Sequence, residues 1–340
     1  MEVPDYPLPE SAIAQHPAEE RDAARLLVSI DPRRPPAHRL VADLAELVGP
    51  GDVVVVNNSR VLAARLPLRK RSGAAAEVLL LEADPPGQED SWIALVRPGR
   101  RLAPGTVLLA GGEPAVEVGE TVEGPGGRRR VRLASLDVIK QVGIVPLPPY
   151  IHEPLEDPER YQTVYARKPA SAAAPTAGLH LTAGLLEACR RRGALVMELD
   201  LAVGLATFAP ISASRVEDHV MHVERYEVPE RTWEACAEAR RVVAIGTTTV
   251  RALESAAATG ELAGGSDLYI RGDYPFAVVD VMMTNFHQPR SSLLVLLEAF
   301  CGPRWRDLYA AALAEGYRFL SFGDAMIVGR QDVGERVERA

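Results

Sequence analysis

Apolar residues follow two alternating patterns along the chain. One is a short apolar stretch, which is typical of a buried strand; it is unbroken at 53–56 and 242–245, and it is interrupted by acidic residues at 194–203 and 278–281. The other is a helical spacing, in which apolar positions recur three and four residues apart; it occurs at 40–48, 183–192, 232–240, 250–258 and 291–300. Strands that alternate with helices predict an α/β domain, here built on a mixed sheet.

The pattern changes between residues 66 and 147. Short apolar runs, among them 92–96 and 131–133, are separated by glycine, proline and charged turns, and there is little helical periodicity. Several short strands at close spacing predict a small barrel or sandwich. We therefore expect a small β-barrel domain at 66–147, inserted into an α/β catalytic domain formed by 1–65 and 148–340.

Polar side chains follow the predicted strands or stand near the end of the last one. They are Asn57, Arg60, Thr247, Thr248, Asn285, His287 and Asp324. Open α/β sheets bind ligands beyond the carboxyl ends of their strands, so these positions indicate a binding site. A simple turn rich in asparagine explains Asn57 equally well.

A loop of small residues at 174–182 runs directly into the predicted helix 183–192. It contains Thr176, Gly178 and His180, and Thr182 is placed to cap the helix. Such a loop offers free backbone N–H groups to an anionic or oxygen-rich ligand. An ordinary turn remains the alternative interpretation.

The segment 219–226 concentrates titratable groups. If it is a strand, His222 and Glu224 point to the same face, and a carboxylate beside an imidazole orients a general base. Two histidines in the segment also suggest metal binding, but no third ligand stands at a supporting spacing, so we expect no metal. Two structural histidines are the remaining alternative.

Charged and aromatic side chains suggest contacts to anions and nucleobases. Arg251, in the first turn of its predicted helix, is unfavourable against the helix dipole, which suggests that it pairs with a ligand anion; a solvated arginine is the alternative. Tyr161, Gln162 and Tyr165 provide hydrogen-bonding aromatics able to stack a base. Arginine clusters in 66–147, at 69–71, 97–101 and 128–130, predict a face that follows phosphates, or else solvated turn charges.

Composition argues against several classes of protein, namely non-specific nucleic-acid binders, membrane-spanning proteins and secreted proteins. The chain has 340 residues, is 47% hydrophobic and carries a net charge of −8, which argues against non-specific nucleic-acid binding by the whole surface. No apolar run is long enough for a membrane span, and the acidic N-terminus is unlike a secretory signal. The three cysteines are far apart, which favours a reducing cytoplasm, and no Gly-rich dinucleotide or Walker motif occurs.

Ten stretches of the chain together carry a resemblance to a known protein family. They are 8–22, 25–28, 54–66, 145–151, 160–166, 173–182, 219–224, 244–255, 284–291 and 318–326. In this order they resemble the S-adenosylmethionine:tRNA ribosyltransferase-isomerases of queuosine biosynthesis. The resemblance runs from Asp5 to about Val328.

The resemblance implies a transferase and isomerase of tRNA modification. Such an enzyme moves the ribosyl part of S-adenosylmethionine onto 7-aminomethyl-7-deazaguanine in the tRNA anticodon loop, giving epoxyqueuosine-tRNA, adenine and methionine. The expected catalytic residues are His180, His222, Glu224 and Asp324. Binding of S-adenosylmethionine is expected at Thr176, Gly178, Thr247, Thr248, Arg251, Asn285 and His287, with Arg251 and the threonines on the methionine carboxylate. Binding of the acceptor is expected at Asn57, Arg60, Tyr161, Gln162 and Tyr165.

Two departures from the family pattern leave the acceptor open. The run 197–208 lacks two histidines that the family typically has, because Glu198 and Ala202 stand in their places, and Ala206 replaces a glycine. The alternatives are therefore a divergent relative that uses S-adenosylmethionine on a small molecule or in another reaction, and a non-catalytic RNA-binding protein.

Overall fold

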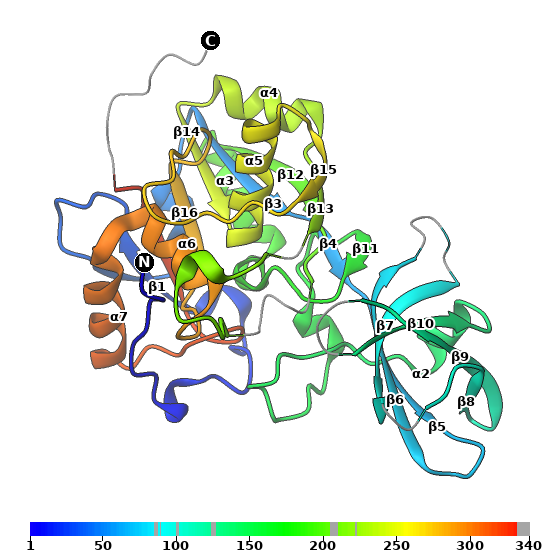
Figure 1. The fold of residues 1–340 in the computed structure, drawn as a ribbon. Coiled ribbons are helices and arrows are strands. Elements are labelled where there is room, and N and C mark those ends of the chain that lie inside the picture. The colour runs from blue at the N-terminus through cyan, green and yellow to red at the C-terminus, as the bar shows by residue number, and fades with distance from the viewer. Residues whose placement is uncertain are drawn as a thin grey trace. The chain divides into compact units, whose positions relative to one another are not determined.

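The structure is a computed structural model that describes residues 1–84, 88, 90–99, 102–123, 127–204, 210–221 and 223–331. It divides the chain into two compact units (Figure 1). One consists of Met1–Arg60 with Pro148–Ala340, and the other of Val61–Leu147. We call them the α/β unit and the barrel unit.

The α/β unit is built on a nine-stranded sheet with the order β15-β13-β12-β3-β14-β16-β17-β1-β2. The strands are β1 (Arg25–Ser29), β2 (Ala37–Leu40), β3 (Asp52–Asn57), β12 (Leu195–Leu201), β13 (Glu224–Glu227), β14 (Arg241–Ile245), β15 (Ala263–Ser266), β16 (Val281–Asn285) and β17 (Ala325–Gly329). Central pairs such as β3–β14 and β14–β16 are parallel, whereas β16–β17 and β12–β13 are antiparallel. The predicted mixed α/β sheet is confirmed.

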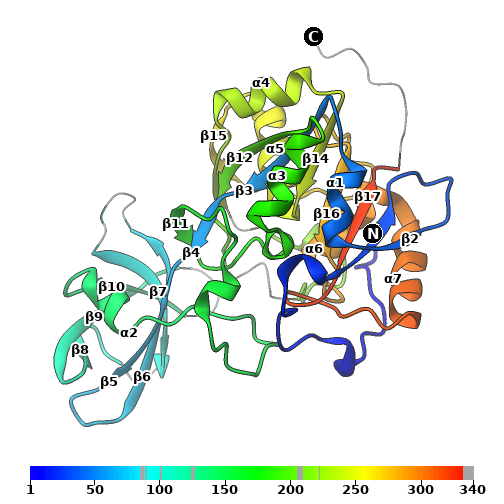
Figure 2. The same cartoon turned by 180° about the vertical axis from the view of Figure 1, so that it is seen from behind.

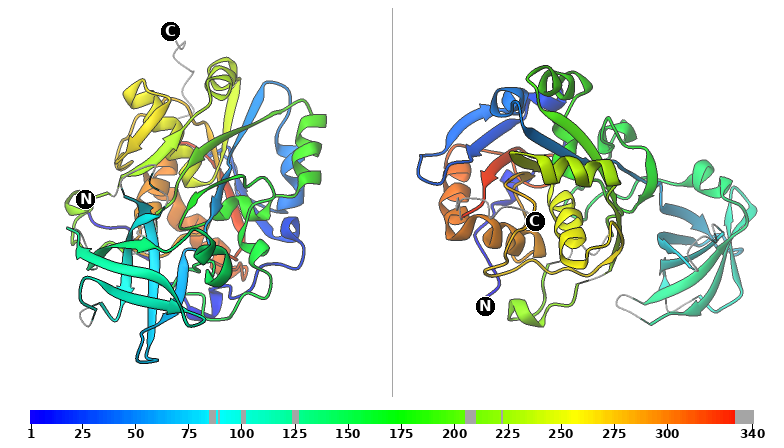
Figure 3. Two further views of the ribbon diagram at one scale, coloured as in Figure 1. Left: turned by 90° about the vertical axis from the view of Figure 1, so that its right-hand side faces the viewer. Right: turned by 90° about the horizontal axis from the view of Figure 1, so that it is seen from above.

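Helices cover both faces of this sheet. They are α1 (Leu44–Leu47), α3 (Ala183–Arg191), α4 (Glu230–Glu238), α5 (Thr247–Thr259), α6 (Ser292–Cys301) and α7 (Trp305–Ala314). Alternate valines of β3 divide between two cores: Val54 and Val56 pack with α1 and α3, and Val53 and Val55 with α4 to α7. Figure 1 is seen from the side of α5 and α6, Figure 2 from the side of α3, and Figure 3 shows the two layers from above.

Three predicted elements have other bounds than expected. The predicted helix 40–48 is helical at 41–47, as a 3-10 helix at Val41–Asp43 followed by α1, whereas Leu40 ends strand β2 and pairs with β1. The predicted strand 278–281 begins only at Val281, because the N–H groups just before it donate to the Glu254 carboxylate. The segment 219–226 becomes strand only from Glu224 onward.

Glu254 of α5 is a structural carboxylate. It is fully buried and accepts hydrogen bonds from the N–H groups of Ala277, Val278 and Val279, at 2.8–3.0 Å. We expect Glu254→Ala to lower the free energy of unfolding by about 3 kcal/mol, because these buried donors lose their acceptor. Urea titration against Glu261→Ala, a matched change at an exposed position, checks this; equal stabilities of the two variants would contradict it.

The barrel unit is a closed barrel with the strand order β10-β7-β6-β5-β8-β9, and it confirms the predicted barrel. Its elements are β5 (Arg65–Arg69), β6 (Ala75–Ala83), β7 (Ser91–Arg97), β8 (Thr106–Ala110), β9 (Glu113–Thr121), β10 (Arg128–Leu133) and α2 (Asp137–Val142). The segments where the chain enters and leaves the barrel unit are paired with each other. Arg65 and Ile144 exchange two backbone hydrogen bonds there, of 3.1 and 2.8 Å.

The arginines of the barrel unit do not all belong to one solvent face. In β10 the burial alternates with a period of two, and Arg129 points inward, where it donates to the carbonyls of Gly119 and Leu102. Arg128 and Arg130 face outward and pair with Glu82 and Asp84. The inward position corrects the expectation that 128–130 as a whole follow phosphates. Arg100 and Arg101 lie outside the described residues.

Short elements complete the α/β unit. Strands β4 (Ser59–Val61) and β11 (Lys168–Ser171) pair in a separate two-stranded sheet. Short 3-10 helices occur at Glu10–Ala12, Arg21–Ala23, Val41–Asp43, Pro158–Tyr161, Thr176–His180, Val216–Asp218 and Gly302–Arg304. None of the helices in the described ranges has the length and apolar character needed to span a membrane.

Candidate active site

The predicted site residues converge because of how the strands run. Parallel strands β3, β14 and β16 end at one edge of the sheet, and β12 joins them because it is parallel to β3. Strands β13 and β17 are antiparallel to their neighbours, so they begin at that same edge. Asp324 therefore lies at this edge by preceding β17, whereas the sequence had suggested the end of a strand.

Asn57, at the end of β3, is fully committed to protein contacts. Its Nδ2 donates to the Leu201 carbonyl at 3.0 Å and to Thr248 Oγ1 at 3.2 Å, and its Oδ1 accepts from the N–H groups of Ser59 and Leu201. The side chain thus fastens the ends of β3 and β12 to the start of α5. A contact of Asn57 with an acceptor molecule would have to replace these bonds.

Helix α5 begins at Thr247, three positions before the predicted start, so Thr247 and Thr248 form its first turn and Arg251 lies in its second. Arg251 donates from Nη1 to the Glu224 carboxylate, and both side chains are less than 10% exposed. Arg251 thus lies beyond the first turn and its Nη1 is paired with Glu224, and the contact of Arg251 with a ligand anion stays a prediction. Glu224 also accepts from the Gly204 N–H at 3.0 Å. The predicted partner His222 lies outside the described residues.

His180 and Asn285 meet in the interior, although 105 positions separate them. Asn285 Nδ2 lies 3.0 Å from His180 Nε2, 3.2 Å from the Leu320 carbonyl oxygen and 3.4 Å from that of Asp324. An amide nitrogen only donates, so Nε2 accepts and the imidazole is neutral. Burial first, and the positive charge of Arg318 second, lower the pKa of His180 to about 4.

The oxygen of the Asn285 amide differs from its nitrogen in having no such contact within the described residues. Asn285 Oδ1 is buried and has no hydrogen-bond partner within the described part of the chain. It belongs to a side chain that lines a hollow of about 360 Å³, whose other walls include Tyr150, Thr176, His287 and Ser321. An acceptor that is withdrawn from water costs free energy unless a donor satisfies it. We call this space the Asn285 hollow.

His287 lines the same hollow as a neutral imidazole. Its Nε2 lies 3.0 Å from Thr284 Oγ1, and burial lowers its pKa to about 3. Its backbone is held on both sides, since its N–H donates to the Tyr309 hydroxyl and its carbonyl accepts from Tyr6. The ring is therefore fixed and uncharged at neutral pH.

Asp324 is engaged by the backbone. One carboxylate oxygen accepts from the Arg25 N–H at 2.9 Å and the other from the Arg318 N–H at 2.7 Å. These bonds hold β1 and the turn 318–324 together at the sheet edge. The geometry favours a structural role for Asp324 over the predicted catalytic one.

The predicted acceptor-binding aromatics are core residues. Tyr161 is fully buried and packs edge-on against Phe322, while Gln162 and Tyr165 are less than 10% exposed. The rings of Tyr161 and Tyr165 are buried in this structure, and binding of the acceptor by these residues stays a prediction. Gly178 packs against Tyr165: a Cβ on Gly178 would lie 2.1 Å from the tyrosine hydroxyl oxygen. Arg60 is more exposed and pairs with Glu159.

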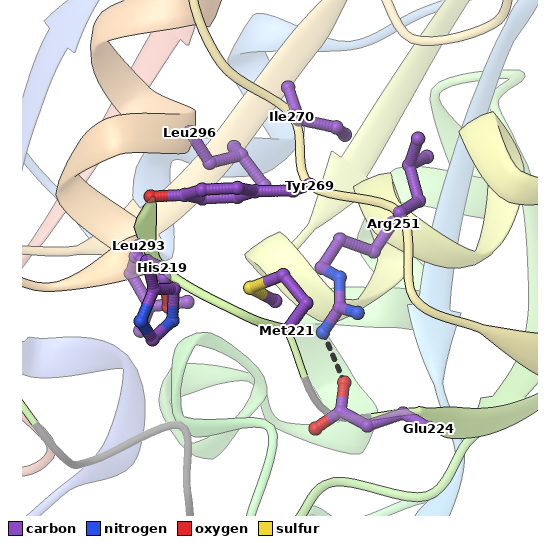
Figure 4. Close-up of a pocket in the computed structure, with 10 residues that line it drawn as sticks. His219, Met221, Glu224, Arg251, Tyr269, Ile270, Leu293 and Leu296 are labelled. Atoms are coloured by element: carbon purple, nitrogen blue, oxygen red, sulfur yellow. Dashed lines mark hydrogen bonds and ion pairs between the residues drawn. The ribbon is translucent and has the colours of Figure 1, made fainter. Parts of the chain in front are cut away.

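The predicted site residues Arg251 and Glu224 line a second hollow, of about 480 Å³, whose other walls, among them Tyr269 and Leu296, the sequence reasoning missed. Figure 4 shows Arg251 and Glu224 on one side of it and Tyr269 and His219 on the other, with Met221 between them. The rings of His219 and Tyr269 meet edge-on. We call it the Arg251 hollow. Its lining residues come from separate segments, among them β13, α5 and α6, so no local sequence signal identifies the whole hollow.

Leu320 is another residue that the sequence did not reveal. Its φ of 68° is unusual for a residue other than glycine. It turns the Leu320 carbonyl toward Asn285, and the neighbouring Ser321 Oγ lies 2.7 Å from the Tyr150 hydroxyl oxygen. A strained turn at a hollow is typical of a site whose geometry is held for function.

A family model described as "Queuosine biosynthesis protein" matches residues 2–328. The chain belongs to this family. The predicted resemblance is thereby confirmed, over nearly the whole chain.

Several members of the queuosine biosynthesis family are similar along their whole lengths. An S-adenosylmethionine:tRNA ribosyltransferase-isomerase of Rubrobacter xylanophilus is 47% identical over 95% of this chain and 96% of the relative. One of Thermus thermophilus is 47% identical over 96% and 99%. The crystal structure of S-adenosylmethionine tRNA ribosyltransferase from Thermotoga maritima is 33% identical, covers 95% of this chain and 99% of that one, and has a TM-score of 0.54.

The structure shows the surroundings of Glu198 and Ala202, which stand where the family typically has histidines. Glu198 lies in β12, where its carboxylate accepts from Arg167 at 2.7 Å and from Asn58 Nδ2 at 3.1 Å. The Ala202 N–H donates to the Arg225 carbonyl. Ala206 lies outside the described residues. Within the described ranges, no group of three or more histidine, cysteine, aspartate or glutamate side chains is placed to hold a metal ion.

Proposed function

We propose that the chain transfers and isomerises the ribosyl part of S-adenosylmethionine onto 7-aminomethyl-7-deazaguanine in the anticodon loop of tRNA. The products are epoxyqueuosine-tRNA, adenine and methionine. Family membership and the names of relatives that match over nearly their whole lengths support this reaction.

The observation that carries the proposal at the site is the unpartnered Asn285 Oδ1 in the Asn285 hollow. An adenosine offers what such an acceptor needs, namely the exocyclic amine of the base and the ribose hydroxyls. Thr176 and Ser321, on the same walls, bring further hydroxyls. We place the adenosyl end of S-adenosylmethionine here.

His180 serves this site through Asn285. Its Nε2 accepts from Asn285 Nδ2, and this bond turns Oδ1 to the other side of the amide. The neutral state of His180 is required for that bond, because a protonated imidazole would present a second donor to Nδ2. We therefore assign His180 a positioning role in place of the proton transfer expected from the sequence.

One incubation tests the reaction. Purified protein, S-adenosylmethionine and tRNA carrying 7-aminomethyl-7-deazaguanine are expected to release adenine and methionine in equal amounts, as measured by mass spectrometry. Unmodified tRNA is the matched control and is expected to give neither. Release without any RNA would favour a small-molecule acceptor, and no turnover in any mixture would contradict the proposed function.

A further inference from the structure

The Arg251 hollow contains polar atoms that lack partners. Arg251 is 5% exposed, and its Nε has no hydrogen-bond partner among the residues that the structure describes. Its Nη2 donates to the Ser266 carbonyl at the long distance of 3.4 Å. The Nε–Nη2 edge of a guanidinium is the fork that binds a carboxylate with two parallel hydrogen bonds. In this protein the fork is turned away from Glu224, which Nη1 contacts.

The rest of the hollow suits a particular kind of occupant. Glu224 places a buried negative charge beside the fork, so the site offers a cation binder and an anion binder side by side. Met221, Leu293 and Leu296 provide an apolar wall, and the Tyr269 ring provides an aromatic face. The Tyr269 hydroxyl is also buried without a partner in the described ranges, and burial raises its pKa to about 12, so it keeps its proton. A zwitterion on a short apolar chain matches this set of groups.

We infer that the Arg251 hollow binds the α-amino-acid end of the sulfonium substrate, with Arg251 on the carboxylate and Glu224 on the ammonium group. The inference rests on the proposed function. Leu293 lines both hollows, and the neighbouring residues Ser291 and Ser292 line one each, so the two spaces meet at the start of α6. An S-adenosylmethionine with its adenosyl end in the Asn285 hollow thus reaches the Arg251 hollow with its amino-acid end.

The pairing differs from the interpretation based on sequence. Thr248 Oγ1 accepts from Asn57 Nδ2 and Thr249 Oγ1 donates to the Ile245 carbonyl, so both hydroxyls already hold contacts within the protein. In this inference Glu224 binds the ammonium group. The substrate's two charges would join an existing ion pair, which compensates each charge in a buried site.

Substrate analogues with matched variants test the inference. In the tRNA assay, Arg251→Lys is expected to raise the KM for S-adenosylmethionine by about 10- to 100-fold, because the fork is lost while the positive charge stays. With decarboxylated S-adenosylmethionine, which has no carboxylate, the same variant is expected to change KM by less than about threefold. Arg271→Lys is the control, because Arg271 stands 5.4 Å from the Tyr269 ring and does not line the hollow.

Glu224→Gln tests the ammonium contact in the same way, with a deaminated analogue. If either variant raises the KM by the same factor for S-adenosylmethionine and for the analogue that lacks the contacted group, the inference is overturned. If a variant fails to fold, the wild-type protein decides: equal KM values for S-adenosylmethionine and its decarboxylated form would overturn it. Wild-type protein that releases no adenine or methionine would contradict the proposed function instead, so the two failures are distinguishable.

Discussion

Replacing Asn285 with alanine is expected to lower kcat/KM for S-adenosylmethionine by about 100-fold, which corresponds to about 2.7 kcal/mol. The change removes the Oδ1 acceptor in the Asn285 hollow and also the amide that holds His180. Steady-state kinetics with modified tRNA measure the loss. Asn58→Ala is the matched control, because Asn58 lies near the same sheet edge but bonds to Glu198 outside the hollow.

A double-mutant cycle separates positioning from direct catalysis by His180. If His180 acts through Asn285, His180→Ala and Asn285→Ala each lower kcat/KM, and the double variant is little worse than either single one. The pH profile of His180→Ala keeps both limbs of the wild-type profile. Additive losses, or the loss of one limb, would show that His180 transfers a proton itself.

Lowering the pH from 8 to 5 is expected to reduce the free energy of unfolding by about 4 kcal/mol through His180 and His287. Their pKa values in the folded protein are about 4 and about 3, below the 6.5 of an unperturbed histidine. Between pH 6.5 and about 4 the unfolded chain therefore binds more protons than the folded one, and stability falls as the pH falls. The contribution is fully present above pH 6.5.

Urea titrations at pH 8 and pH 5 measure this dependence. His287→Gln is expected to remove about half of the difference between the two conditions, whatever its effect on stability at pH 8. His152→Gln, at an exposed position, is the control and is expected to leave the difference unchanged. A wild-type-like dependence in His287→Gln would contradict the assignment.

The sequence predicted those parts of the fold that depend on interactions between residues close together in the chain, such as strand propensity and helix capping. Four consecutive valines at 53–56 favour a strand that is buried on both faces, and β3 is indeed buried along its whole length. Thr182 caps α3 as expected, since its hydroxyl accepts from the Leu185 N–H. The periodicity at 40–48 predicted the helical residues 41–47, whereas Leu40 pairs with Arg25 of β1 instead.

The contacts at the site follow from topology, which the sequence pattern does not display. The pattern placed Asn285, Thr248 and Asn57 at strand ends, but the bond of Asn285 to His180 and the pair of Arg251 with Glu224 join separate segments. Asp324 illustrates the same limit. Its position after a glycine turn was visible, yet its two backbone donors depend on β1 and β17 lying side by side.

The paired ends of the barrel unit have an entropic consequence for the α/β unit. An unstructured insertion between β4 and the segment from Pro148 onward would have to close a long loop, and the entropy cost of closure grows with loop length. The Arg65–Ile144 hydrogen bonds hold entry and exit together from within the barrel unit. Once the barrel has folded, the two ends of the insertion are held together, so the α/β unit closes only a short connection when it folds. Changes in loop length inside the barrel unit therefore leave the loop-closure entropy of the α/β unit unchanged.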